Sequence, residues 1–287
     1  MKLAGYGEDR LVKLLTRGLD AVGDDCAVIG GPQDKTWRLL KTDAVIEGVH
    51  FFPGEKAALV GWKALCRAIS DIAAMGGEPR EALITVAAHG DVEVAWMRGL
   101  YTGLNKAAKA YGVRIVGGET ARSPGPLFLS VALTGEVAPK RCVRRGGGKP
   151  GDALFVTGRL GGSLRGWHLR FTPRVAQAQW LTRHCLPSAM MDLSDGLASD
   201  LPRLAEASGC GFFLDDEAVP LNKGCTIGQA LRDGEDYELL FAVPAVRADK
   251  LIAAWSSAFP KLALTRIGQL TSGKIKPPAD RGHDHFA

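Results

Sequence analysis

Acidic residues of this sequence recur in short polar clusters. The clusters are GDD at Asp24 and Asp25, KTD at Asp43, SDIAAMGG at Asp71, GGET at Glu119 and DLSDG at Asp192 and Asp195. Adjacent glycines permit tight turns, and backbone amides or hydroxyl groups bind phosphate. Oxygen-only ligand sets suit Mg²⁺, which prefers a few carboxylates together with phosphate oxygens and water. The pattern therefore favours metal-dependent phosphate chemistry, and no matching histidine and cysteine set indicates zinc.

Each carboxylate also has a simpler structural interpretation. Asp195 precedes an expected helix, where an N-cap role and a ligand role both stay open. Asp71 falls inside an otherwise apolar helical segment, so capping does not explain it. We expect Asp24 and Asp200 to be turn and surface residues rather than ligands.

Other polar residues give weaker signals of phosphate binding. GGE at 117–119 and GG at 161–162 are weak phosphate-loop signals, because the chain has neither GxxxxGKS/T nor a strand-anchored GxGxxG. Arg145, in a glycine-flanked basic turn, either holds a phosphate or is a solvated linker residue. His50 precedes apolar residues, as packed histidines often do, and Glu235 precedes an expected strand, where hydrogen-bonding and turn roles are both open.

Helical and extended patterns alternate in the N-terminal half. Apolar residues at three-to-four spacing predict helices over residues 8–19, 57–76 and 94–112, the last closed by Gly112. Strands are expected over residues 24–30, 36–46, 83–89, 113–118 and 127–137. Because strands outnumber helices and several have short connections, we expect an α+β layered domain with antiparallel pairing.

A Pro, Gly and basic segment at residues 138–152 separates this half from the rest. We place the domain boundary near residue 138, which gives domains 1–138 and 139–287. Further strands are expected over residues 152–158, 189–194, 236–243 and 263–270, with helices over 196–209 and 246–259.

Composition limits the classes of function. The 287 residues are 46% hydrophobic and 23% charged, with a net charge of +5 and a pI near 8.9. Because the basic residues are scattered and no aromatic platforms lie among them, we expect no nucleic-acid partner. No apolar run reaches membrane-spanning length, the six cysteines form no CxxC pair, and no secretory leader is recognised. We therefore expect a cytoplasmic protein without a membrane partner.

The combined motifs resemble a known family. GDDCAV, TDAVIEGVHF, SDIAAMGGEP, GGET, RGGGKPGD, MDLSDGLASDL and GEDYELLF stand in the order and approximate spacing of the thiamine-monophosphate kinases. That family lies in the aminoimidazole ribonucleotide synthetase superfamily. The resemblance extends from about residue 7 to Phe286, and EGVHF with GEDYELLF is specific to the kinase.

The resemblance implies a two-domain α+β fold with mixed and antiparallel sheets, helices packed on them, and N-terminal strands that form a dimer barrel. It implies a homodimer that transfers the γ-phosphoryl group of ATP directly to thiamine monophosphate, with several Mg²⁺ ions. The metal ligands implied are Asp25, Thr42, Asp43, Asp71, Glu119, Asp192 and Asp195. The ATP contacts implied are Tyr101, Gly118, Arg145 and Ser194, and the thiamine phosphate contacts are His50, Glu235 and Phe286.

Two departures from the family pattern accompany the resemblance. The chain has GGET where the family usually has GGDT, so Glu119 reaches a metal through one more methylene. The segment around residues 160–171 is also shorter than in the family. Three other readings stay open: a sister ATP-dependent synthetase, a metal-dependent phosphohydrolase, and a non-catalytic nucleotide-binding dimer.

Overall fold

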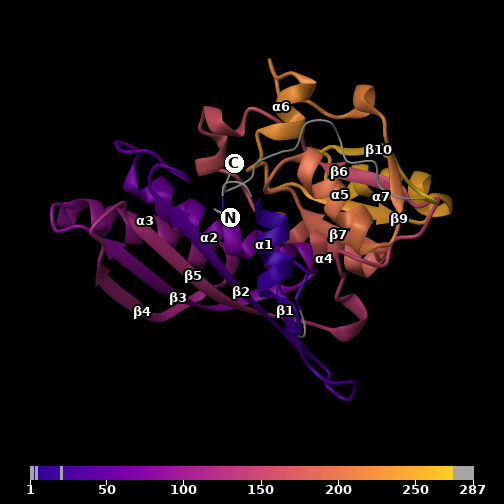
Figure 1. The fold of residues 1–287 in the computed structure, drawn as a ribbon. Helices are drawn as coiled ribbons and strands as arrows, with labels where there is room; N and C mark the ends of the chain where they lie inside the picture. The colour runs from indigo at the N-terminus through magenta and orange to yellow at the C-terminus, as the bar shows by residue number, and fades with distance from the viewer. Residues whose placement is uncertain (1–2, 4–5, 20–21, 274–287) are drawn as a thin grey trace. The chain divides into compact units, whose positions relative to one another are not determined.

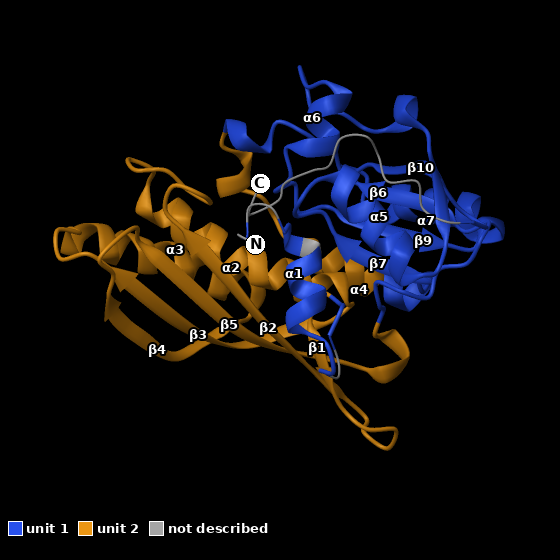
Figure 2. Ribbon diagram, in the orientation of Figure 1, with its two compact units in different colours: residues 1–24, 143–165, 181–287 blue, residues 25–142, 166–180 orange. Residues whose placement is uncertain are grey.

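The computed structural model describes residue 3, residues 6–19 and residues 22–273. The predicted contact Phe286 lies outside these residues. The chain forms two compact units, coloured separately in Figure 2. Unit 1 comprises residues 1–24, 143–165 and 181–287, and unit 2 comprises residues 25–142 and 166–180. Each unit has its own sheet and hydrophobic core, which confirms the predicted α+β class.

Unit 2 is built on a mixed five-stranded sheet. Its strands are β1 (Ala27–Ile29), β2 (Trp37–Ile46), β3 (Glu78–Ala88), β4 (Arg114–Arg122) and β5 (Phe128–Val137). They lie in the order β1-β2-β5-β3-β4, with β3 and β4 parallel and the other neighbours antiparallel. The parallel strands β3 and β4 are joined by a crossover connection that contains a helix, as parallel strands require.

Helices α2 (Ala57–Ala74) and α3 (Val94–Tyr111) cover one face of this sheet (Figure 1). Side chains of a strand alternate between faces. Leu39 and Ile84 are therefore fully buried beneath the helices, whereas their neighbours Leu40 and Leu83 are 40% and 48% exposed on the other face. We call this second face the open face. Helix α3 ends at the left-handed Gly112, with φ of 69°, as predicted.

Unit 1 contains a second five-stranded sheet, in which the neighbouring strands are all antiparallel. Its strand order is β7-β9-β6-β10-β8. The strands are β6 (Ala153–Thr157), β7 (Ala189–Asp192), β8 (Gly211–Leu214), β9 (Leu239–Val243) and β10 (Leu264–Thr271). The helices are α1 (Glu8–Leu15), α5 (Leu197–Ala207), α6 (Ile227–Arg232) and α7 (Ala248–Ala258). Helix α4 (Val175–His184) contains the change from unit 2 to unit 1.

The two units do not follow a single boundary near residue 138. One change of unit does lie close to it, after residue 142, but residues 1–24 group with unit 1 and residues 166–180 with unit 2. Residues 166–180 contact unit 2 directly, because Trp62 of α2 donates a hydrogen bond from Nε1 to the carbonyl of Phe171 at 2.9 Å. Within the described residues, no helix is both long and apolar enough to cross a membrane.

Candidate active site

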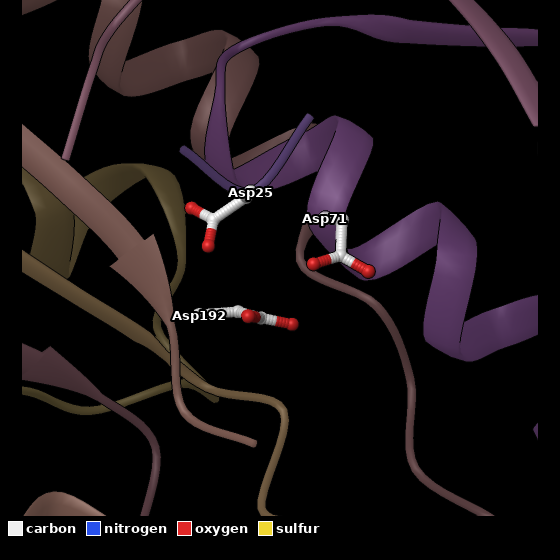
Figure 3. A group of neighbouring side chains, drawn as sticks. All are labelled: Asp25, Asp71 and Asp192. Carbon is white, nitrogen blue, oxygen red and sulfur yellow. The ribbon is translucent and has the colours of Figure 1, made fainter. Parts of the chain in front are cut away.

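Two predicted metal ligands of unit 2 lie side by side. Asp25 stands two residues before β1, and Asp71 lies in the C-terminal half of α2. Their carboxylates offer oxygen atoms within 4.8 Å of each other. Figure 3 labels both side chains. The residues are only 6% and 8% exposed. Two buried carboxylates at this spacing repel each other, so the pair is suited to a cation.

Basic residues on β2 and α2 partly neutralise Asp71 and its neighbour Asp43. Lys41 Nζ lies 2.9 Å from Asp71 Oδ1, and Arg67 Nη2 lies 3.5 Å from Asp43 Oδ1. Burial disfavours the charged form of Lys41, but Asp71 and Asp43 outweigh it, so the pKa of Lys41 is raised. Asp43 and Lys41 are two residues apart on β2 and therefore share the face that α2 covers. The structure thus brings Asp43 into the surroundings of Asp71.

Thr42 and Glu119 lie on the open face instead. Thr42 alternates with Asp43 on β2, and its Oγ1 lies 3.4 Å from Oγ of Ser130. Glu119 pairs with Thr85 on β3, which in turn pairs with Ser130 on β5, so these side chains share one face. The sheet therefore separates Thr42 and Glu119 from Asp43 and Asp71.

Gly118 has a structural reason to be glycine. A Cβ atom at this position would lie 1.8 Å from the carbonyl oxygen of Ile84 on the paired strand. The predicted ATP contact Tyr101 lies on α3, half-buried against the core of unit 2.

His50 is held in a tight turn after β2. It is 7% exposed, its Nδ1 accepts from the Ile46 amide at 3.1 Å, and its carbonyl accepts from Lys63 Nζ at 2.5 Å. Lys63 is fully buried in α2 and also donates to Nδ1 of His168 at 2.8 Å. A buried ammonium therefore fixes the backbone of the turn that carries His50.

In unit 1, the loop after β7 carries three predicted contacts. Asp192, also labelled in Figure 3, ends β7 and is 2% exposed. The amides of Ser194 and Asp195 both donate to Oδ2 of Asp200, at 3.1 and 3.0 Å. Nη1 of Arg203 bonds Oδ1 of Asp200 at 3.1 Å and also pairs with Asp195.

The expectation that Asp200 is a surface residue is wrong. Asp200 is fully buried. It lies three residues after Leu197 and four before Leu204, which puts it on the buried face of α5. Burial and the neighbouring Asp195 raise the pKa of Asp200, and Arg203 opposes that rise.

Arg145 and Asp195 line the same pocket of unit 1, which has a volume of about 370 Å³. The amide of Arg145 donates to Oδ1 of Asp24 at 2.8 Å. Asp24 thus anchors the basic turn through a side chain that is only 12% exposed, so the expected surface position is wrong. The pocket wall mixes charges, because Lys13 and Arg203 line it together with their ion-pair partners Glu206 and Asp195.

Glu235 lies in a strained segment. Glu235 and Tyr237 have positive φ values of 53° and 51°, which non-glycine residues rarely adopt. The Glu235 amide donates to the Ser194 carbonyl at 2.7 Å, and the Tyr237 amide to Leu193 at 2.8 Å. Backbone hydrogen bonds to the loop after β7 therefore stabilise this strained conformation. Strained backbone of this kind is typical of functional sites.

The glycine turn at 161–162 does not offer its amides to a phosphate. The Gly161 amide donates to Oδ1 of Asp236 at 3.0 Å, and the Gly162 amide to Oδ2 of Asp233 at 2.7 Å. Burial raises the pKa of Asp236 to about 8, because the charged carboxylate is poorly solvated there.

Comparison with known proteins identifies the family. Residues 23–137 match the profile of the AIR synthase related protein, N-terminal domain, and residues 169–277 match that of the C-terminal domain. The thiamine-monophosphate kinase of Salmonella typhimurium is 34% identical over 307 residues, which cover 93% of this chain and 91% of that protein. The chain belongs to the thiamine-monophosphate kinase family. The kinase of Aquifex aeolicus is 33% identical over 326 residues and covers 100% of both chains.

A solved structure agrees with this thiamine-monophosphate kinase assignment. The structure described as AaThiL complexed with AMPPCP and TMP superimposes with a TM-score of 0.87 at 32% identity. The match covers 100% of this chain and 99% of that one.

Sequence reasoning missed several residues that hold the site of this kinase family member, although signals for some were present. Lys41 lies two residues before Asp43 on one strand, and Arg67 lies four residues before Asp71 on one helix, so periodicity placed each pair on a common face. Lys63 had no such signal, because its partner His168 is distant in sequence.

Proposed function

We propose that this chain catalyses the ATP-dependent phosphorylation of thiamine monophosphate to thiamine diphosphate. The observation that carries the proposal is the full-length similarity to a structure complexed with AMPPCP and TMP. The buried Asp25 and Asp71 pair of this chain supports it. The names of the curated relatives support the same activity.

The donor chemistry fits Mg²⁺. Asp25 and Asp71 are buried, offer only oxygen, and stand close enough to act on one ion. These two would hold it, and the further ligands proposed are Thr42, Asp43, Glu119, Asp192 and Asp195. Because Thr42 and Glu119 lie on the open face, the full set is suited to several ions rather than one. Bound Mg²⁺ supplies positive charge that offsets the charge of the phosphates.

The acceptor needs no general base from the protein. An alkyl phosphate has its second pKa near 6, so the attacking oxygen is already mostly deprotonated at neutral pH. The obstacle is repulsion between two polyanions, about 4 kcal/mol per pair of unit charges 4 Å apart at an effective dielectric constant near 20. Catalysis therefore depends on alignment and charge neutralisation.

The chain's own residues have separate tasks in this scheme. Arg145 and Ser194 bind the nucleotide phosphates, with Tyr101 and Gly118 as further ATP contacts. His50, Glu235 and Phe286 bind thiamine monophosphate. Support for His50 comes from its fixed turn, and support for Glu235 comes from its strained, hydrogen-bonded backbone.

The proposed assembly is a homodimer formed through the open face of unit 2. Leu40, Leu83 and Val116 are 40%, 48% and 54% exposed on β2, β3 and β4. A Leu83→Glu variant should shift the protein to a monomer in light scattering coupled to size-exclusion chromatography. Val246→Glu is the matched control, because Val246 is 92% exposed in unit 1. A Leu83→Glu variant with an unchanged mass would contradict this interface.

The activity is tested with ATP, Mg²⁺ and thiamine monophosphate, with chromatographic separation of the products. Asp71→Asn should abolish formation of thiamine diphosphate while the fold is retained. Asp91→Asn is the control, because the Asp91 side chain is 95% exposed in the same unit. ADP formed without thiamine diphosphate would favour a phosphohydrolase, and nucleotide binding without turnover would favour a binding dimer.

A further inference from the structure

The loop after β7 has an unusual hydrogen-bonding arrangement. Its carbonyls at Leu193 and Ser194 accept from Tyr237 and Glu235, and the Leu193 amide donates to the carbonyl of Glu238 at 2.9 Å. The remaining two amides of the loop, at residues 194 and 195, have a side chain as their acceptor. These two half-buried backbone donors need an acceptor, and one side chain of α5 supplies it for both.

That side chain is Asp200. A single oxygen, Oδ2, accepts both loop amides, and the other oxygen faces Arg203. The loop then turns into α5 at Gly196, where φ is 94° and an added Cβ would lie 2.6 Å from the carbonyl oxygen of Leu231. Close packing at Gly196 thus leaves the loop little room to find another acceptor.

We propose that Asp200 is a positioning residue for nucleotide binding, which it serves by accepting the amides of Ser194 and Asp195. This inference rests on the proposed function, in which those two residues contact ATP and its metal. Asp200 does not itself line the pocket of unit 1, whereas Asp195 does. Its effect therefore passes through the loop.

The acceptor role makes a specific prediction for two substitutions. Asp200→Asn keeps an oxygen that can accept both amides and loses only the contact with Arg203. Asp200→Ala removes the acceptor and leaves the two half-buried amides without their partner. We expect the dissociation constant for AMPPCP with Mg²⁺ to rise at least tenfold in Asp200→Ala and less than threefold in Asp200→Asn.

The test measures that dissociation constant by titration calorimetry, with KM values for ATP and thiamine monophosphate beside it. Asp249→Asn is the matched control, since Asp249 is an exposed aspartate in the first turn of α7. In Asp200→Ala the KM for ATP should rise together with the dissociation constant for AMPPCP, and the KM for thiamine monophosphate should change less than threefold. Thermal unfolding identifies a variant that fails to fold. If Asp200→Ala fails to fold, Asp200→Ser takes its place, and its dissociation constant is compared with that of Asp200→Asn.

The outcomes separate this inference from the proposed function. Unchanged nucleotide affinity in Asp200→Ala would overturn the inference, and so would an Asp200→Asn variant as impaired as Asp200→Ala. A wild-type protein that binds AMPPCP with the predicted variant pattern but makes no thiamine diphosphate would refute the proposed function and support the inference.

Discussion

The crossing of α2 and α3 offers a sharp test of the framework that positions Asp71. The two helices meet at glycines, because a Cβ at Gly103 would lie 1.9 Å from the carbonyl oxygen of Ala58, and one at Gly61 would lie 2.0 Å from that of Leu100. The obstructing atoms are backbone and cannot rotate away. We therefore predict that Gly103→Ala forces the helices apart.

The magnitude follows from this geometry. Close carbon to oxygen contacts are about 3.3 Å, so the new methyl group at residue 103 would lie roughly 1.4 Å too near. Overpacking typically costs about 1–3 kcal/mol, and a clash with helix backbone belongs at the upper end. Replacing glycine by alanine in a helix returns about 1 kcal/mol. The net loss should be about 2 kcal/mol or more.

Gly99→Ala is the matched control on the same helix. Its added methyl would lie 3.0 Å from the Cβ of Ala57 and 4.0 Å from the Ala58 nitrogen. The small adjustment and the gain in helix propensity nearly cancel, so its free energy of unfolding should stay within about 1 kcal/mol of wild type.

Urea unfolding followed by far-UV circular dichroism measures both variants. With a slope of about 1–3 kcal/mol per molar urea, the Gly103→Ala midpoint should fall by roughly 1 M. Equal midpoints for Gly103→Ala, Gly99→Ala and wild type would refute the close crossing of α2 and α3.

Three further predictions concern single side chains. Lys63→Met leaves the His50 carbonyl and His168 Nδ1 without their buried donor, so the free energy of unfolding should fall by about 2–4 kcal/mol and the KM for thiamine monophosphate should rise. Asp236 has a pKa raised from 3.8 to about 8, so the folded protein keeps this proton at pH values where the unfolded chain has lost it. The free energy of unfolding of the wild type should therefore fall as the pH rises from about 4 to about 8. Asp236→Asn should flatten this dependence of stability on pH, measured by urea unfolding. Glu119→Asp should retain activity in initial-rate assays, because the shorter carboxylate keeps the same ligand chemistry.

Controls make each of these decisive. Lys109→Met removes an exposed lysine of α3, and Asp216→Asn an exposed aspartate of unit 1. A Lys63→Met variant as stable as Lys109→Met would contradict the role of the buried ammonium. If Asp236→Asn and Asp216→Asn share the wild-type pH profile, the raised pKa of Asp236 is refuted. Loss of activity in Glu119→Asp would show that the backbone of β4 is adapted to glutamate.

Long periodic elements of the fold were predictable from the sequence. The helix expected over residues 57–76 is α2, and the helix closed by Gly112 is α3. Their apolar residues recur at helical spacing because one face of each packs on a sheet. Asp71 stood out because it interrupted that apolar pattern, and the structure places it in a buried carboxylate pair.

Single long-range contacts were not predictable in the same way. Residues 166–180 join unit 2 through contacts such as the one between Trp62 and Phe171, which leave no period in the sequence. Asp200 was misjudged for a different reason. Its spacing from Leu197 and Leu204 is that of the buried face of α5, but its acidic character led to the expectation of a surface residue. The need of two loop amides for an acceptor appears only in three dimensions.

The central claim is direct phosphoryl transfer between ATP and thiamine monophosphate. Phosphorus NMR of the protein with both substrates and Mg²⁺ tests it most directly, because each phosphate species gives its own resonance. We predict that thiamine diphosphate and ADP appear in equal amounts, without inorganic phosphate. Inorganic phosphate released while thiamine monophosphate stays unchanged would contradict the account.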